Sequence, residues 1–284
     1  MGLKNFGFID NSFVVAMRKQ FMADSYDGNE EQFDPMDIEK IQKDDWFVKR
    51  FLIAAYKNQD EAVRRMTESL KWRKEQRLRQ LKDSDFPREF FETGSLFQYE
   101  NDKNGIPSLI MRLKFVRRIP EILDYMKLFC MYNCFLIDEA QNGAGWVLVL
   151  DFSGCTYSQY QNIDLLHYFI TTMHTNFPAG IDYVLAVDIP WVLTSFWGLV
   201  KMWIPEKRRD MVQFCSKANL SDFFDPENLP PVLGGYCKRK YKFYPKDTVS
   251  AFEFGKVMGL DRDRCDEIYM EFEPLLQECA EEEE

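Results

Sequence analysis

The stretch DYVLAVDIPWVLTSFWGLVKMWI, residues 182–204, decides the fold. Its first part is an apolar run typical of a buried strand (183–188), and after a proline it continues as a predicted helix rich in tryptophan. On that helix Thr194, Gly198 and Lys201 are spaced i, i+4 and i+7, so the polar and small residues form one narrow stripe. A helix that is apolar over nearly its whole circumference is either buried in a core or in contact with lipid.

The same stretch is the most lipophilic in the chain, but its charged residues argue against a membrane span. Asp188 and Lys201 interrupt it, and an aspartate at the centre of a span costs about 2.5 to 3.5 kcal/mol on insertion scales. The N-terminal MGLKNFGFID has no apolar core of the kind that signal peptides need, and Phe6 stands where a myristoylation signal needs Ser or Thr. We therefore expect no transmembrane helix and no secretion signal.

Working outward from this stretch, the pattern predicts an α/β fold. Residues 146–151 are apolar on both faces, as expected for an interior strand, and 162–177 have helical periodicity. Together with 182–204 they form a βαβ unit. Two shorter strands are predicted at 96–99 and 108–115, so we expect a mixed, largely parallel sheet.

The chain divides into four predicted parts. Residues 1–35 are expected to be a flexible N-terminal segment, because they contain the polar run DSYDGNEEQFDP. Residues 36–92 have helical periodicity and form a helical subdomain. Residues 93–240 carry the sheet, and residues 241–284 are a weakly helical C-terminal extension with an acidic tail.

Charge and cysteine content exclude several classes of protein. The formal charge is −10, but nine acidic residues and no Lys or Arg follow Arg264; without that tail 36 basic residues face 37 acidic ones. The body has no dominant basic face, so we expect no nucleic-acid partner. The seven cysteines include no CxxC pair and no zinc-type spacing with His167 or His174, which indicates reduced core thiols in a cytosolic chain rather than disulfides or a metal site.

Motifs of known enzymes are incomplete in this sequence. Residues 151–154 read DFSG, similar to the kinase DFG, but no glycine-rich loop or HRD motif accompanies them. There is no GxSxG, and two histidines in all leave acid–base catalysis poorly supplied. We expect a protein that is not an enzyme and needs no cofactor or metal.

Four phrases carry a resemblance to a known family. Residues 51–74, 145–154, 167–212 and 229–235 resemble, in order and spacing, the CRAL-TRIO lipid-binding family. The resemblance covers about residues 36–236. The phrase DPMDIEKIQKDDWFVKRFL (34–52), together with SLKWRKE (69–75), is most similar to the branch of motile sperm domain-containing proteins. Those proteins continue with a motile-sperm domain and a C-terminal membrane anchor. The present sequence has neither, as expected for a fragment or a shortened relative.

The resemblance implies an apolar lipid pocket that is floored by the sheet and closed by a mobile lid helix, here residues 191–204. The residues alone leave an ordinary core helix as the alternative. The side chains that we expect in the pocket and lid are Val147, Val149, Phe169, Val184, Ala186, Trp191, Leu193, Phe196, Trp197, Val200 and Trp203.

Family members that transfer phosphatidylinositol mark the headgroup site with Arg, Glu, Thr and Lys. The positions of this sequence that align with those four are Ala55, Ala179, Arg208 and Met211. None matches, so we do not expect exchange of phosphatidylinositol.

Tocopherol-transferring members instead dock on phosphoinositide membranes through basic residues beside the lid. By that resemblance Lys201, Lys207, Arg208 and Arg209 are candidate membrane-docking residues, each contributing about 1 kcal/mol near an anionic surface. The alternative is a solvated helix face that pairs with neighbouring acids.

Two functional hypotheses follow. The first is non-catalytic binding, and possible transfer, of a hydrophobic lipid, with docking on membranes or lipid droplets. The second is a membrane- or droplet-targeting adaptor without transfer activity, whose apolar helix inserts into the interface. Either protein would be cytoplasmic and peripheral to membranes, at the endoplasmic reticulum or lipid droplets if it is part of the longer family protein.

Overall fold

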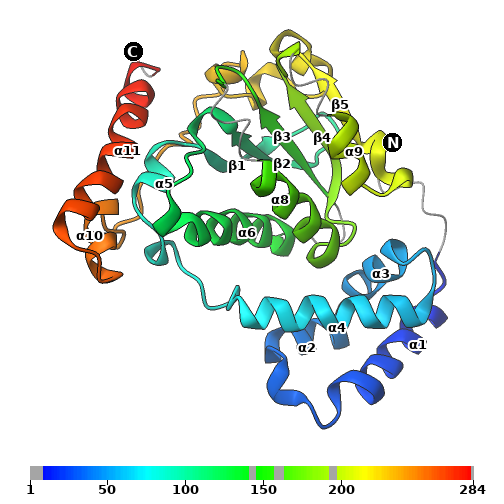
Figure 1. Ribbon diagram of the computed structural model, residues 1–284. Coiled ribbons are helices and arrows are strands. Elements are labelled where there is room, and N and C mark those ends of the chain that lie inside the picture. The colour runs from blue at the N-terminus through cyan, green and yellow to red at the C-terminus, as the bar shows by residue number, and fades with distance from the viewer. Residues whose placement is uncertain (1–8, 141–144, 157–162, 192–196, 283–284) are drawn as a thin grey trace.

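The computed structural model describes residues 9–140, 145–156, 163–191 and 197–282. Within them five strands form one sheet in the order β1-β2-β3-β4-β5 (Figure 1). The strands are β1 (Leu96–Asn101), β2 (Pro107–Arg112), β3 (Trp146–Asp151), β4 (Ile181–Val187) and β5 (Val212–Cys215). β1 is antiparallel to β2, and the other neighbouring pairs are parallel. The predicted mixed, largely parallel sheet is confirmed.

The helices that connect the parallel strands lie on one side of the sheet. α6 (Leu123–Ala140) joins β2 to β3, and α8 (Ile163–Asn176) joins β3 to β4. In Figure 1 α8 is seen in front of the strands and α6 below them. α9 (Trp197–Trp203) precedes β5. The predicted βαβ unit is therefore present as β3–α8–β4.

The two faces of the sheet belong to two separate cores, because side chains alternate along a strand. Leu148 and Val184 face α6 and α8. Val147, Val149 and Leu185 face the opposite way. They pack on short 3₁₀ turns between Lys217 and Leu233, whose buried residues are Leu220, Phe224, Leu229 and Leu233.

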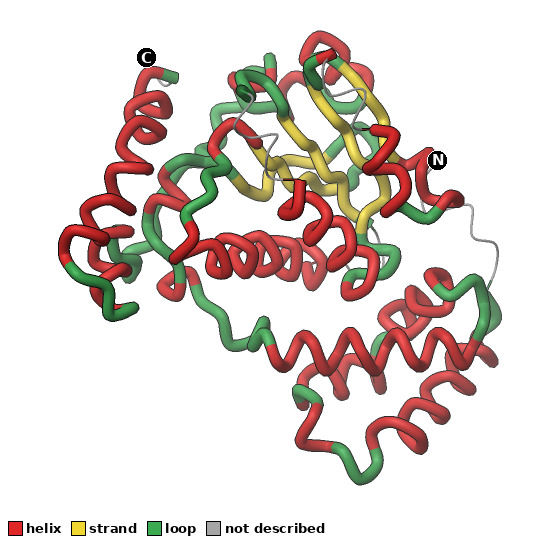
Figure 2. The backbone as a smooth tube through the Cα atoms, viewed as in Figure 1, coloured by secondary structure: helices red, strands yellow, loops and turns green. Residues whose placement is uncertain are grey.

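The helical subdomain has a core of its own. It consists of α1 (Asn11–Phe21), α2 (Pro35–Lys43), α3 (Asp45–Ala54) and α4 (Gln59–Glu75). Each of these helices begins behind a side chain that accepts a backbone N–H, the residues being Asp10, Asp34, Asp44 and Asn58. Figure 2 shows that this part of the molecule contains helices and loops but none of the strands.

The prediction of a flexible segment over residues 1–35 is wrong for residues 9–35. Val14, Met17 and Phe21 form the buried face of α1. Phe33 lies in the polar run, yet its ring packs edge-on against Phe21 with 5.5 Å between centroids. One buried aromatic residue thus fixes a loop that its polar neighbours made appear mobile.

The C-terminal residues are also part of the body. α5 (Glu89–Glu92), α10 (Ala251–Val257) and α11 (Arg262–Glu281) share one hydrophobic core with α6. In Figure 1 these three helices lie to the left of α6. α11 has a buried stripe at helical spacing, formed by Cys265, Ile268, Phe272, Leu275 and Cys279. Describing residues 241–284 as a weakly helical extension is therefore wrong, because their apolar stripe completes the main core.

Candidate functional site

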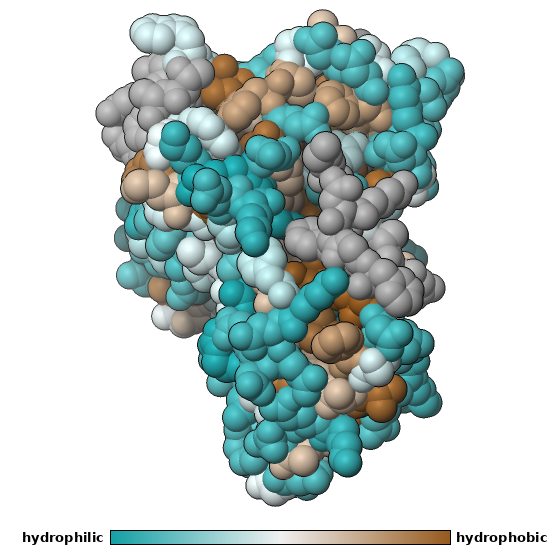
Figure 3. All heavy atoms as spheres, turned by 90° about the vertical axis from the view of Figure 1, so that its right-hand side faces the viewer, coloured by the Kyte–Doolittle hydropathy of each residue, from teal (hydrophilic) through white to brown (hydrophobic). Residues whose placement is uncertain are grey.

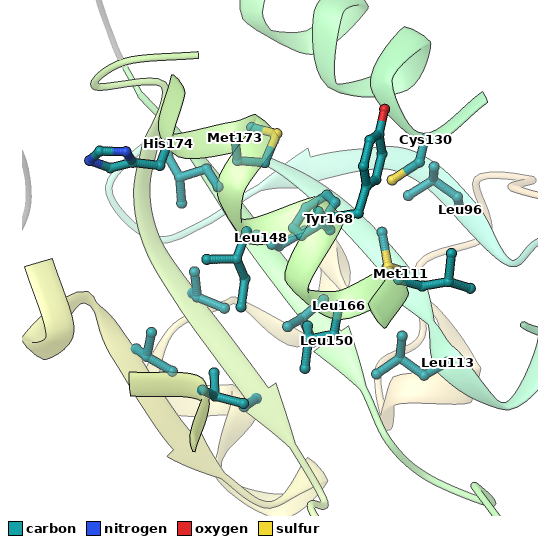
Figure 4. Close-up of a pocket in the computed structure, with 18 of the residues that line it drawn as sticks. Leu96, Met111, Leu113, Cys130, Leu148, Leu150, Leu166, Tyr168, Met173 and His174 are labelled. Atoms are coloured by element: carbon teal, nitrogen blue, oxygen red, sulfur yellow. The ribbon is translucent and has the colours of Figure 1, made fainter. Parts of the chain in front are cut away.

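A cavity of about 400 Å³ lies between the sheet and the helices that cover it. Its floor consists of alternate residues from the central strands: Met111, Leu148, Leu150, Val184 and Ala186. Figure 4 shows Leu148, Leu150 and Met111 with Leu166 of α8 around the same space. Side chains alternate between the two faces of a strand, so every second residue of these strands points toward the helices. Those residues are apolar and form the floor of the cavity.

The walls come from helices far apart in the sequence. α8 provides Leu165, Leu166, Phe169 and Met173, and α6 provides Met126, Phe129 and Cys130. Phe272 of α11 and Ile53 of α3 complete opposite parts of the lining. A cavity lined in this way suits a ligand with a large apolar surface, since pockets for small molecules are mostly apolar with a few placed polar groups.

The polar groups of the cavity include Arg208 and His174. The guanidinium of Arg208 donates to the carbonyl oxygen of Ile181 at 3.0 Å, and burial lowers the pKa of Arg208. Removal from water also lowers the pKa of His174, and the charges of Arg65 and Arg208 act in the same direction. Arg208 is thus a cation beside an imidazole whose pKa is lowered, while Lys127, the other cation in the lining, pairs with Asp124.

The structure places five of the predicted pocket and lid residues in this lining. They are Phe169, Val184, Ala186, Trp197 and Val200. The ring of Trp197 also packs edge-on against Phe214, with 5.1 Å between centroids. Leu193 and Phe196 lie outside the described residues.

Four predicted pocket residues lie elsewhere. Val147 and Val149 belong to the core on the opposite face of the sheet; assigning them to the pocket was wrong because β3 is apolar on both faces and the other parity faces the cavity. Trp203 packs against His167 with 4.6 Å between ring centroids. Trp191 is 84% exposed. Neither tryptophan is part of the lining.

The four candidate docking residues have different surroundings. Lys201 is exposed, and the ammonium of Lys207 lies 4.4 Å from the centre of the Tyr56 ring. Arg209 donates from Nε to the carbonyl oxygens of Lys201 and Ile204, at 2.8 and 3.2 Å, and so caps the last turn of α9. Arg208 is half-buried and lines the cavity. Of the four, Lys201 and Lys207 are exposed, whereas Arg208 and Arg209 are half-buried.

The positions that correspond to the inositol headgroup code lie at one end of the cavity. Ala179, Arg208 and Met211 line it, and Ala55 is buried next to the lining residues Ala54 and Tyr56. None of these four side chains matches the code of the phosphatidylinositol-transferring members.

Several lining residues were not predicted, among them Met111, Leu113, Phe129 and Phe272. Alternation along 108–113 marks Met111 and Leu113 as facing one side together. Phe272 sits on the apolar stripe of α11, which is visible in the sequence as a 3-4-3-4 spacing. The sequence pattern within each strand or helix does not show which apolar faces pack against one another and which line a cavity.

Fold and cavity together define a class of α/β domain that encloses an apolar ligand between its sheet and its helices. The model of the CRAL/TRIO domain matches residues 91–235, and the chain belongs to this family. CRAL-TRIO proteins bind or transfer lipids and are generally non-catalytic.

Individual relatives agree with this assignment. The chain is 30% identical over 215 residues to "Protein real-time" of Anopheles gambiae, covering 66% of this chain and 31% of that protein. It is 24% identical over 235 residues to "Phosphatidylinositol transfer protein SFH5" of Candida albicans, covering 74% and 73% of the two chains. The chain thus spans about a third of the length of the real-time proteins that it matches.

A solved structure shows the same fold. The crystal structure of Sfh5 superposes with a TM-score of 0.63 at 13% identity, covering 89% of this chain and 98% of that one. In the described part of the chain, no helix has the length and apolar character needed to cross a membrane.

Proposed function

We propose that the protein binds a hydrophobic lipid in the cavity between the sheet and α6, α8 and α9, and can transfer it between membranes. The observation that carries the proposal is the cavity of about 400 Å³ with an almost wholly apolar lining. Burial of apolar ligand surface at about 25 cal/mol per Å² is the driving force. Membership of the CRAL-TRIO family supports the same conclusion.

The lining also limits the kind of lipid. Arg208 and His174 offer hydrogen-bond donors and one positive charge at the end of the cavity near Ala179. The rest of the lining is mainly apolar, and its other cation, Lys127, already pairs with Asp124. The ligand we propose has a long apolar body and a single acidic or acceptor group that pairs with Arg208, rather than an inositol phosphate.

The test is to purify the protein from cells and to identify what it retains by native mass spectrometry and lipid extraction. We expect one lipid per chain in the wild type. Ala186→Phe fills the floor of the cavity and should lower the bound lipid at least tenfold. Ala218→Phe adds the same side chain at an exposed position and is the matched control. The proposal would be overturned if the folded wild-type protein and the folded Ala218→Phe control both retained no lipid.

A second function is favoured by one further observation. Trp191 and Met202 are 84% and 66% exposed, and neither lines the cavity. Figure 3 shows hydrophobic surface between the hydrophilic helical subdomain and the sheet domain, on the side of the molecule that carries α9. We propose that this side docks on a membrane or a lipid droplet, as interfacial tryptophans do. The kinship proposed with the motile sperm domain-containing branch favours the endoplasmic reticulum and lipid droplets as the surfaces.

The adaptor alternative is separated from lipid transfer by measuring both properties in one variant. In an adaptor, Ala186→Phe leaves vesicle flotation and droplet association unchanged, and no transfer of lipid between vesicles is detected in the wild type. In a transfer protein, the same variant docks normally but loses transfer together with the bound lipid.

A further inference from the structure

A second cavity, of about 420 Å³, lies on the other face of the strands that floor the first. Where β2 and β3 end, Met111, Leu113 and Leu150 face the apolar cavity. The residues between and beside them face the second one: Arg112, Lys114, Asp151 and Ser153. The rest of its lining is Gly154, Lys217, Pro231, Val232 and Glu282. The carboxyl end of a parallel sheet is a common place for ligands in α/β folds.

Arg112 is the most unusual group in this second cavity. It is 2% exposed, and its guanidinium stacks 4.5 Å from the centre of the Phe115 ring. Its Nη2 donates to Oε1 of Glu282. Its Nε and Nη1 have no acceptor among the described residues. A buried donor without an acceptor is costly, so this guanidinium can bind more acceptor atoms than the chain supplies.

Glu282, immediately after α11, is the carboxylate that enters this basic site. It accepts from Lys114 Nζ at 2.8 Å and lies 3.4 Å from Lys242 Nζ. Burial alone would raise the pKa of Glu282, but the hydrogen bonds from Arg112 and Lys114 outweigh it and lower the pKa to about 2. One carboxylate, with two oxygens, thus meets three cations.

Lys217 supplies a further positive charge at the wall. Its backbone N–H donates to Asp188 Oδ1 at 3.1 Å, which fixes the start of its 3₁₀ turn. Within the described ranges its ammonium forms no ion pair. Asp151 is the other acid in the lining, and one of its oxygens accepts from the Ser153 N–H at 3.0 Å.

We propose that this second cavity is a binding site for a phosphate monoester. In the absence of phosphate, the carboxylate of Glu282 occupies the position that the phosphate would take. A phosphate offers three acceptor oxygens where the carboxylate offers two, and arginine binds such groups through two parallel N–H bonds. Once Glu282 has left, Nη2 of Arg112 forms such a parallel pair with either Nε or Nη1, the two donors that have no acceptor among the described residues. The phosphate enters as Glu282 leaves, and Lys114 and Lys217 neutralise its charge.

The phosphate could belong to a soluble molecule or to a lipid headgroup, and two probes separate these sources. Inorganic phosphate, titrated calorimetrically into the protein in a phosphate-free buffer, tests the first. Flotation on phosphatidylcholine vesicles containing phosphatidic acid, against phosphatidylcholine alone, tests the second. We expect Glu282→Gln to bind at least one probe about tenfold more tightly than the wild type, because the competing charge is gone.

Arg112→Gln should lose that binding, but it also removes the partner of Glu282. Lys217→Gln is therefore the cleaner variant, since its ammonium holds no ion pair within the described ranges; we expect about tenfold weaker binding with an unchanged melting temperature. Lys256→Gln, an exposed lysine on α10, is the control. No binding of either probe by Glu282→Gln, or binding that Lys217→Gln and Arg112→Gln both leave unchanged, would overturn the site. Lipid content of the first cavity, measured in parallel, keeps this outcome separate from that of the proposed function.

Discussion

Arg50 and Asp138 form a buried, two-pronged ion pair that joins the helical subdomain to α6. Nη1 and Nη2 of Arg50 each lie 2.7 Å from one oxygen of Asp138, and the two side chains are 4% and 3% exposed. Nε of Arg50 donates to the carbonyl oxygen of Pro178 at 2.6 Å, directly before the lining residue Ala179. The pair thus connects α3, α6 and the segment that follows α8.

Asp138→Asn should destabilise the protein by about 3 to 5 kcal/mol, because it leaves Arg50 buried without its counter-charge. Arg73, 3.5 Å from the same carboxylate, loses a partner as well. The measurement is urea unfolding followed by circular dichroism. Asp124→Asn, on the exposed first turn of the same helix, is the control and should change the free energy of unfolding by less than about 0.5 kcal/mol. A loss below about 1 kcal/mol for Asp138→Asn would contradict this account.

The docking of the α11 C-terminus should depend on pH through Glu282. Burial raises the pKa of its carboxyl, but the bonds from Arg112 and Lys114 bring it down to about 2 from 4.5. A lowered pKa means that the stabilisation is fully present above pH 4.5 and is lost as the pH falls from about 4.5 toward 2. Hydrogen exchange of α11 amides should accelerate over that range in the wild type. Glu282→Gln should show fast exchange at every pH, and equal protection in both proteins would refute the role of Glu282.

If the side of the molecule that carries α9 inserts into lipid, replacing its exposed apolar residues should weaken vesicle binding. Trp191→Asp/Met202→Asp should weaken flotation on vesicles at least tenfold, because two exposed apolar side chains each contribute about 1.5 to 3 kcal/mol when buried. Neither residue lines the cavity, so lipid content should not change. Val257→Asp, 81% exposed on α10, adds the same charge far from α9 and should float like the wild type. Flotation that survives the double substitution would exclude this surface.

The charges beside α9 predict a dependence on anionic lipid. Lys201→Glu/Lys207→Glu should reduce binding to phosphatidylserine-containing vesicles by about tenfold or more, since each lysine near such a surface contributes about 1 kcal/mol. The effect should shrink at high salt. Lys256→Glu serves as the control. We exclude Arg209 from the variant because it caps α9, so its loss would also change the helix end.

The sequence predicted the sheet, the βαβ unit and the helical subdomain because each leaves a local periodic signal. It could not choose between Val147 and Leu148 as pocket floor, since a strand buried on both faces has no polar side to orient it. The resemblance to tocopherol-transferring members predicted Arg208 at the surface, but in the structure it lines the cavity and is half-buried.

Contacts between residues far apart in the chain could not be predicted from the sequence, for a different reason. Arg112 and Glu282 are 170 residues apart in sequence, and no local pattern links them. The apolar stripe of α11, by contrast, was present in the sequence. Its spacing was outweighed by the surrounding carboxylates, although burial depends on one face of a helix and not on its mean polarity.

The alternation at the ends of β2 and β3 has a consequence for how this chain can change. Leu113 and Lys114, or Leu150 and Asp151, are adjacent in sequence but face cavities of opposite chemistry. Inserting or deleting one residue within either strand would turn charged side chains into the apolar cavity and aliphatic side chains into the charged second cavity. These strands should therefore accept substitutions far more readily than changes in length.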